Sequence, residues 1–240
     1  MHTIKETLLH AAQAVSVFMT AFDVEVERLE KSKGERVPGG QMLAYFPAIP
    51  DIDAKITAIL IHARRLITEV CLIPETFWCL KRQHSDPAHL VEKELAPLLG
   101  EQHRMIQWLR TRLDPMKIII DFRNGQEHVA TTKGLPLVFK NFAMSPMNQI
   151  MAPGWGLEGR GLTDINVDLP RIMDVLVEFA EVMLVASIDA NLPDFPPMKV
   201  FGVDAPNAAC PIRYTLNVDE MKLFEEMQRG TAGGKLDPPS

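Results

Sequence analysis

The chain has 240 residues, a net charge of −6 and a pI near 5.7, and 47% of its residues are hydrophobic. This length and apolar share are ordinary for one large globular domain, or for one domain with an appendage, and they allow a sizeable core. The acidic surface counts against a general binder of nucleic acid or anionic membranes, because a polyanion would need a local basic patch.

Two helices are predicted in the first third of the chain. Apolar residues recur every three or four positions from Thr3 to about Lys33, which is one face of a long amphipathic helix. Glycine and proline at 34–40 predict its end. Asp51 and Asp53 are cap candidates for a second helix, whose predicted buried stripe is Ile56, Ile59, Leu60, Ala63, Ile67 and Val70.

A third helical run is predicted over residues 88–113, and Pro97 and Gly100 are expected to kink or interrupt it. The dipeptide Asp114-Pro115 is typical of a helix start, with a cap residue followed by a proline in the first turn. We therefore expect the run to end there and a new element to begin after a short turn.

The polar cluster at residues 121–128 has two local interpretations. Lys117 to Phe122 is rich in β-branched and aromatic residues, and Asn124-Gly125 is a strong hairpin signal. On a helix, however, Arg123 and Glu127 would be i, i+4 neighbours able to pair, and Gly125 would cost about 1 kcal/mol relative to alanine. Local signals leave both open.

The later part of the chain predicts a β-excursion, a last helix and an irregular end. Residues 135–155 are expected to form a small β-hairpin, and the last long helix is expected to begin near Asp168 and reach about Leu192. The domain division is thus a helical unit at 1–192 and an irregular segment at 193–240. This segment is predicted to hold a possible strand at Ile212–Leu216, a short helix at Val218–Gln228 and a disordered tail at Gly230–Ser240.

The run Phe122-Arg123-Asn124-Gly125-Gln126-Glu127-His128 resembles the signature of the HEPN (higher eukaryotes and prokaryotes nucleotide-binding) domains, an arginine and a polar residue followed after three positions by a histidine. In that family the signature lies on a helix of an all-α bundle. The resemblance covers residues 1–191 in outline, although its specific content is a few residues. It implies a mainly α fold, an antiparallel bundle of four to five long helices with the small β-hairpin excursion.

The resemblance also implies an activity, metal-independent cleavage of RNA. His128 would be the general acid or base and Arg123 would stabilise the charge of the transition state, while Asn124 and Glu127 would contact the substrate. In the family the site is often completed across a dimer interface. The expected partners are RNA or a nucleotide and a second copy of the chain. No cofactor is expected.

The alternative is a non-catalytic helical interaction or scaffold protein, in which Arg123 pairs with Glu127 or Asp121. The spacing of His84 and His89 does not favour a metal site, so no metal is expected. Three cysteines without a C-x-x-C pair fit a reducing compartment, and no stretch was expected to span a bilayer. The expected location is the cytoplasm. A homodimer is also expected, because the apolar stripe of a long helix and the methionines Met144, Met147 and Met151 offer more apolar surface than one chain would cover.

Overall fold

The computed structural model describes residues 2–32, 45–80, 84–127, 135–192, 198–203 and 214–225. The chain is mainly helical, as predicted. The helical elements are α1 (His2–Ser32), α2 (Ile52–Cys71), the 3₁₀ turn η1 (Ile73–Thr76), α3 (Pro87–Leu90), the π-helical turn η2 (Val91–Leu95), α4 (Ala96–Leu99), α5 (Arg104–Glu127) and α6 (Ile165–Asp189). The strands are β1 (Leu137–Lys140), β2 (Ala143–Met144), β3 (Ile150–Met151), β4 (Gly154–Leu157), β5 (Thr163–Asp164), β6 (Met198–Gly202) and β7 (Tyr214–Val218).

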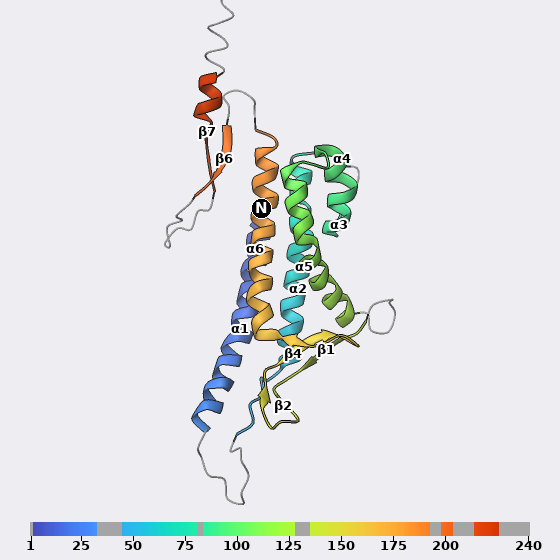
Figure 1. Ribbon diagram of the computed structural model, residues 1–240, viewed down its shortest axis with the longest axis vertical. Coiled ribbons are helices and arrows are strands. Elements are labelled where there is room, and N and C mark those ends of the chain that lie inside the picture. Colours follow the sequence, from blue (N-terminus) through green and yellow to red (C-terminus); the bar gives the residue numbers. More distant parts are fainter. Residues whose placement is uncertain are drawn as a thin grey trace, which may run out of the picture.

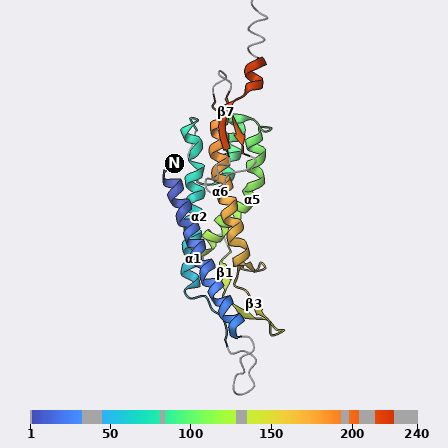
Figure 2. The ribbon, with the colours of Figure 1, turned by 90° about the vertical axis from the view of Figure 1, so that its left-hand side faces the viewer.

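Four long helices, α1, α2, α5 and α6, lie side by side along the long axis of the molecule in both views (Figures 1 and 2). The short elements α3, η2 and α4 cover the end of α2 and α5 at the top of Figure 1, and the strands β1 and β4 cross the opposite end. Most of the stability of each helix comes from the apolar face that it packs on its neighbours.

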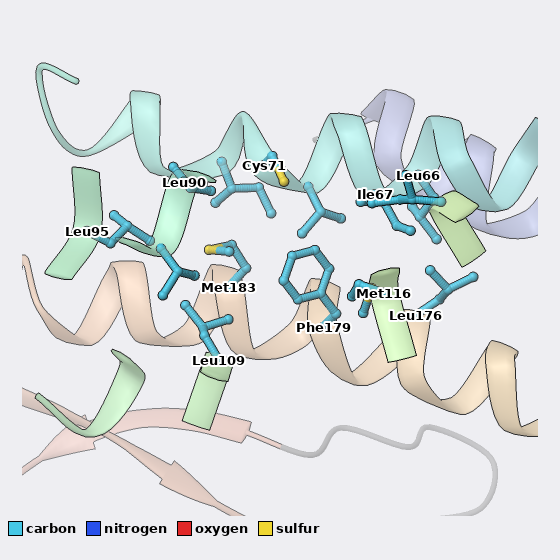
Figure 3. Packing of buried hydrophobic residues seen from close by; sticks show 14 of the residues in the cluster. Leu66, Ile67, Cys71, Leu90, Leu95, Leu109, Met116, Leu176, Phe179 and Met183 are labelled. Atoms are coloured by element: carbon cyan, nitrogen blue, oxygen red, sulfur yellow. The ribbon is translucent and has the colours of Figure 1, made fainter. Parts of the chain in front are cut away.

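One core cluster joins α2, α5 and α6 (Figure 3). Leu66, Ile67 and Cys71 of α2 face Leu176, Phe179 and Met183 of α6, and Leu109 and Met116 of α5 close the space between them. All of these side chains are at most 1% exposed. The predicted stripe of α2 is confirmed, since each of its six apolar residues is buried.

A second core cluster joins α1 and α2 to the sheet. Phe18 of α1, Ile56 of α2 and Trp155 of β4 are fully buried in it. The sheet has the strand order β1-β4-β5, all antiparallel, and β2 pairs with β3 as a separate hairpin. The predicted β-excursion is therefore present, but it continues beyond residue 155 to β5.

The segment after α6 contains an antiparallel hairpin, in which β7 overlaps the strand predicted at Ile212–Leu216 and β6 was not predicted. Strands β6 and β7 pair from Met198–Val218 to Gly202–Tyr214, and residues 220–225 are helical. The backbone N–H of Val200 donates to the carboxylate of Asp189 at the end of α6. The predicted tail, Gly230–Ser240, lies outside the described residues.

The predicted helix break at Asp114-Pro115 is wrong, because α5 runs through Pro115 without interruption. A proline inside a helix removes one N–H donor and costs about 3 kcal/mol. Leu109 before Pro115 and Ile119 after it are at most 1% exposed and belong to one core cluster, and this shared packing offsets the cost. The interruption expected at Pro97 and Gly100 is confirmed: α4 ends at Leu99, and Gly100 has a φ of 94°.

One described helix, Thr3–Ser32, is long and apolar enough to cross a membrane by length and composition. The expectation that no stretch meets this test is therefore corrected. Core helices of soluble proteins and signal sequences meet the same test. In this structure the face of the helix formed by Ala11, Val15 and Phe18 is buried.

Glu25 is a buried carboxylate that holds the segment before α2 against α1. It is 3% exposed, and it accepts hydrogen bonds from the Tyr45 hydroxyl, the Ala48 N–H at 3.1 Å and the Arg28 guanidinium at 2.8 Å. Burial opposes its ionisation, but these donors outweigh burial and hold the pKa of Glu25 below its usual value. The ionised carboxylate of Glu25 thus stabilises the folded state.

We expect Glu25→Gln to lower the free energy of unfolding at neutral pH by about 1 to 3 kcal/mol. A carboxylate with a lowered folded pKa contributes fully above the ordinary glutamate pKa of about 4.3, and this contribution is lost as the pH falls through the folded pKa. The difference between wild type and variant in urea unfolding should therefore shrink below about pH 4.3. Glu27→Gln is the control, since Glu27 is 64% exposed and should change stability little. A difference that stays constant down to pH 3 would contradict a stabilising charge on Glu25.

Candidate functional site

The signature segment is helical as far as the structure describes it. Residues 117–127 form the last turns of α5, so the hairpin interpretation of this part is excluded. Arg123, Asn124 and Glu127 therefore lie on one helix, as the resemblance implies. His128 lies outside the described residues.

Arg123 is turned inward and paired within its own helix. Its side chain is 13% exposed, and its guanidinium forms an ion pair and hydrogen bond with the Glu127 carboxylate one turn later. Ile120, three residues before Arg123, is buried in the core. Burial lowers the pKa of the Arg123 guanidinium, because it disfavours the charged form. The guanidinium of Arg123 is thus paired with a carboxylate of its own helix.

The other two residues of the predicted site face differently. Asn124 is exposed on the surface of α5. Gln126, which the sequence did not single out, donates its side-chain amide to the Thr57 hydroxyl and so links the end of α5 to α2. The structure brings Arg123 and Glu127 together and leaves Asn124 directed away from them.

Gly125 is required by a close approach of the backbone. A Cβ atom at this position would lie 2.5 Å from the Leu135 carbonyl oxygen and 2.9 Å from the Leu137 nitrogen. Real Cβ atoms do not approach backbone atoms so closely, and these atoms belong to the chain that enters β1. The glycine of the signature therefore lets the β1 strand pack on α5, and it does not form a turn.

Trp155 anchors the sheet to α5 and α6. Its ring is fully buried and meets Phe122 of α5 edge to face, with the ring centroids 5.0 Å apart. Its indole N–H donates to the Asp168 carboxylate at 2.8 Å, and the Thr163 hydroxyl donates to the same oxygen at 2.5 Å. Asp168 lies in the first turn of α6, where a negative charge is favoured by the helix dipole.

A pocket of about 490 Å³ opens between α5, α6 and the sheet. Its wall is mainly apolar, with Phe122 and Ile118 from α5, Trp155 from β4 and Ile172 and Val175 from α6. Four charged side chains also line it, namely Asp121, Arg160, Asp168 and Arg171. Volumes of about 300 to 1,000 Å³ are typical of sites for small ligands.

Arg160 and Arg171 are functional candidates that the sequence did not single out. Arg160 lies near the end of the glycine-rich stretch Gly154–Gly161, in which Gly154–Leu157 is a buried strand at the centre of the sheet. The sequence did contain a signal for this strand. Trp155 stands between two glycines, and Thr163 and Asp168 follow it as polar residues able to bind its indole N–H or the backbone near it. No local pattern shows that α5 and α6 meet beside this strand.

Metal and thiol chemistry find little support in the described part of the chain. There, no group of three or more histidine, cysteine or acidic side chains could hold a metal ion. His84 Nε2 lies 3.2 Å from Glu94 and its ring lies 6.3 Å from that of His89. Cys71 is buried, and burial raises its pKa to about 12, so its thiol is not a nucleophile near neutral pH.

Comparisons with protein-family models, with curated proteins and with solved structures find no match for this chain.

We expect Gly125→Ala to destabilise the protein by about 1 to 3 kcal/mol, because the added methyl group overlaps the backbone of β1. The variant gains about 1 kcal/mol of helix propensity, so a stable variant would mean that the approach is looser than the structure has it. Chemical denaturation measures the change. Asn124→Ala is the matched control, since Asn124 is the exposed neighbour and its replacement should be neutral or slightly stabilising.

Proposed function

We propose that this protein is a HEPN-like helical domain that acts as a non-catalytic interaction module, with the four long helices forming an antiparallel bundle. The observation that carries the proposal is the ion pair of Arg123 with Glu127. A catalytic arginine must be able to reach a phosphate, whereas this guanidinium is 13% exposed and already neutralised by a carboxylate. Breaking the pair would leave a largely buried charge without its partner, which is costly.

The second candidate function is a metal-independent endoribonuclease, or an RNA- or nucleotide-binding module. It is favoured by the helical placement of Arg123 and Asn124, which agrees with the signature that the sequence resembles. In this function Glu127 would release Arg123 when the substrate binds. His128 would then supply the general acid or base, as the resemblance implies.

The location that we propose is the cytoplasm. Cys71 is buried and Cys79 is exposed, and both are free thiols in the described part of the chain. Free thiols are usual where glutathione and thioredoxin keep cysteines reduced.

The partner that we propose is a second copy of the chain. The β2–β3 hairpin projects from the helical body (Figure 1), and Met144, Met147 and Met151 on it are 39%, 83% and 54% exposed. Flexible methionine side chains are suited to protein contacts, and a two-fold dimer is the commonest closed assembly of identical chains.

We expect the wild-type protein to show no cleavage of single-stranded RNA in the presence of EDTA beyond that of the double variant Arg123→Ala, His128→Ala. The reason is that the paired Arg123 cannot stabilise the transition state. Glu127→Gln, which removes the pairing charge, should not create turnover either, because the side chain of Arg123 stays inward. Lys117→Ala is the control, as it breaks an exposed i, i+4 pair with Asp121 on the same helix.

Wild-type cleavage that the double variant abolishes would overturn the non-catalytic proposal and support the ribonuclease. RNA binding that appears only in Glu127→Gln would show instead that the ion pair blocks an RNA site. A gel assay and a filter-binding assay on the same preparations separate these two results.

We expect the wild type to be a dimer at micromolar concentration and Met147→Glu to be a monomer, because a charge on the hairpin tip would be buried in the interface. Met147 is 83% exposed, so the variant should fold normally. Met221→Glu is the matched control, since Met221 is 75% exposed on the helical segment after β7. Light scattering measures both masses. A monomeric wild type, or dissociation of the control as well, would contradict an interface at this hairpin.

A further inference from the structure

We infer that the pocket between α5, α6 and β4 is a binding site for an apolar carboxylate, a small organic acid whose body is a ring system or a short hydrocarbon chain. The wall supplies the reason for an apolar body. Phe122 and Trp155, whose rings meet edge to face, line the pocket together with Ile172 and Val175 of α6. Such a wall gains free energy by excluding water from apolar surface.

The charged side chains supply the reason for an anion. Of the two acidic residues in the wall, Asp121 is ion-paired with Lys117 at 2.8 Å, whereas Asp168 keeps its negative charge and accepts hydrogen bonds from the neutral donors Trp155 and Thr163. The side chains of Arg160 and Arg171 have no hydrogen-bond or ion-pair partner among the described residues, so two positive charges stand against the one negative charge of Asp168. The uncompensated charge in the wall is therefore positive, although the chain as a whole carries −6.

The same pairing disfavours a nucleotide as the ligand. A base is recognised by hydrogen bonds to its polar edge, and the wall would have to offer free donors and acceptors inside the pocket. The Thr163 hydroxyl and the Trp155 N–H are the polar groups nearest the apolar wall, and both donate to Asp168. A carboxylate needs no such edge, because a guanidinium can hold its two oxygens at the mouth of the pocket.

The position of the two arginines fits this arrangement. Arg160 is exposed and follows Gly159, whose φ of 75° turns the chain after β4. Arg171 is exposed on the second turn of α6. Both arginines line the pocket and are exposed, whereas Trp155 lines it and is fully buried. A ligand with an acid group at one end would thus bury its body and leave the acid at the arginines.

The test uses the full-length protein and titration calorimetry with 2-naphthoate, decanoate, the neutral analogue 2-naphthalenemethanol and adenosine monophosphate. We expect saturable binding of one or both carboxylates, with a weaker or undetectable response to the alcohol and the nucleotide. Arg171→Gln and Arg160→Gln should each weaken carboxylate binding about threefold to tenfold, and Val175→Phe should abolish it by filling the pocket.

Arg104→Gln is the matched control, because Arg104 is an exposed arginine at the start of α5, outside the pocket wall. The two pocket arginines are also exposed, so their variants should fold like the wild type. Equal binding of acid and alcohol, or an equal loss in Arg104→Gln, would overturn the assignment of an anion site. Tighter binding of adenosine monophosphate would replace the carboxylate by a nucleotide, and no saturation by any compound would remove the site.

This inference goes beyond the proposed function and fails separately from it. Arg123 and Glu127 do not line the pocket, so RNA cleavage and carboxylate binding are measured on different residues.

Discussion

The contact that the rest of the structure depends on is the backbone approach of the β1 segment to Gly125 near the end of α5. It places the sheet against the last turns of this helix, so that Trp155 of β4 is buried beneath Phe122. A buried indole N–H needs an acceptor, and Asp168 supplies it from the first turn of α6. One steric condition thus fixes the relation of α5, the sheet and α6, and the pocket is the space that these three elements leave between them.

Neighbouring residues of the signature consequently have different roles. Successive residues on a helix point about 100° apart, so Phe122 lines the pocket while Arg123 turns inward to its ion pair and Asn124 faces solvent. The pocket arginines whose side chains have no partner within the described ranges come from elsewhere, from the turn after β4 and from α6. For this reason the geometry supports binding at the pocket better than catalysis at the signature.

Sequence patterns predicted the elements whose signals repeat along the chain. The spacing of apolar residues every three or four positions predicted α1, α2 and the last long helix. This signal is strong because each stripe contains many residues that must be buried together. Asp114-Pro115 misled because a cap and a proline are a local signal of only two residues. Core packing on both sides of Pro115 outweighs this local signal, since Leu109 and Ile119 are buried in one cluster. Asn124-Gly125 was ambiguous for the same reason, and the close approach of β1 explains its glycine.

The sequence by itself determined the mainly helical character, the bounds of the first two helices to within a few residues and the candidacy of Arg123, Asn124, Glu127 and His128. It also showed that Arg123 and Glu127 could pair, because that depends only on helical spacing. Only the tertiary structure decided that the Arg123 side chain is mostly shielded from solvent, that Trp155 is anchored by Asp168, and that Arg160 and Arg171 line one apolar pocket. These facts depend on contacts between segments that are distant in the chain, and no local period or motif encodes which segments meet.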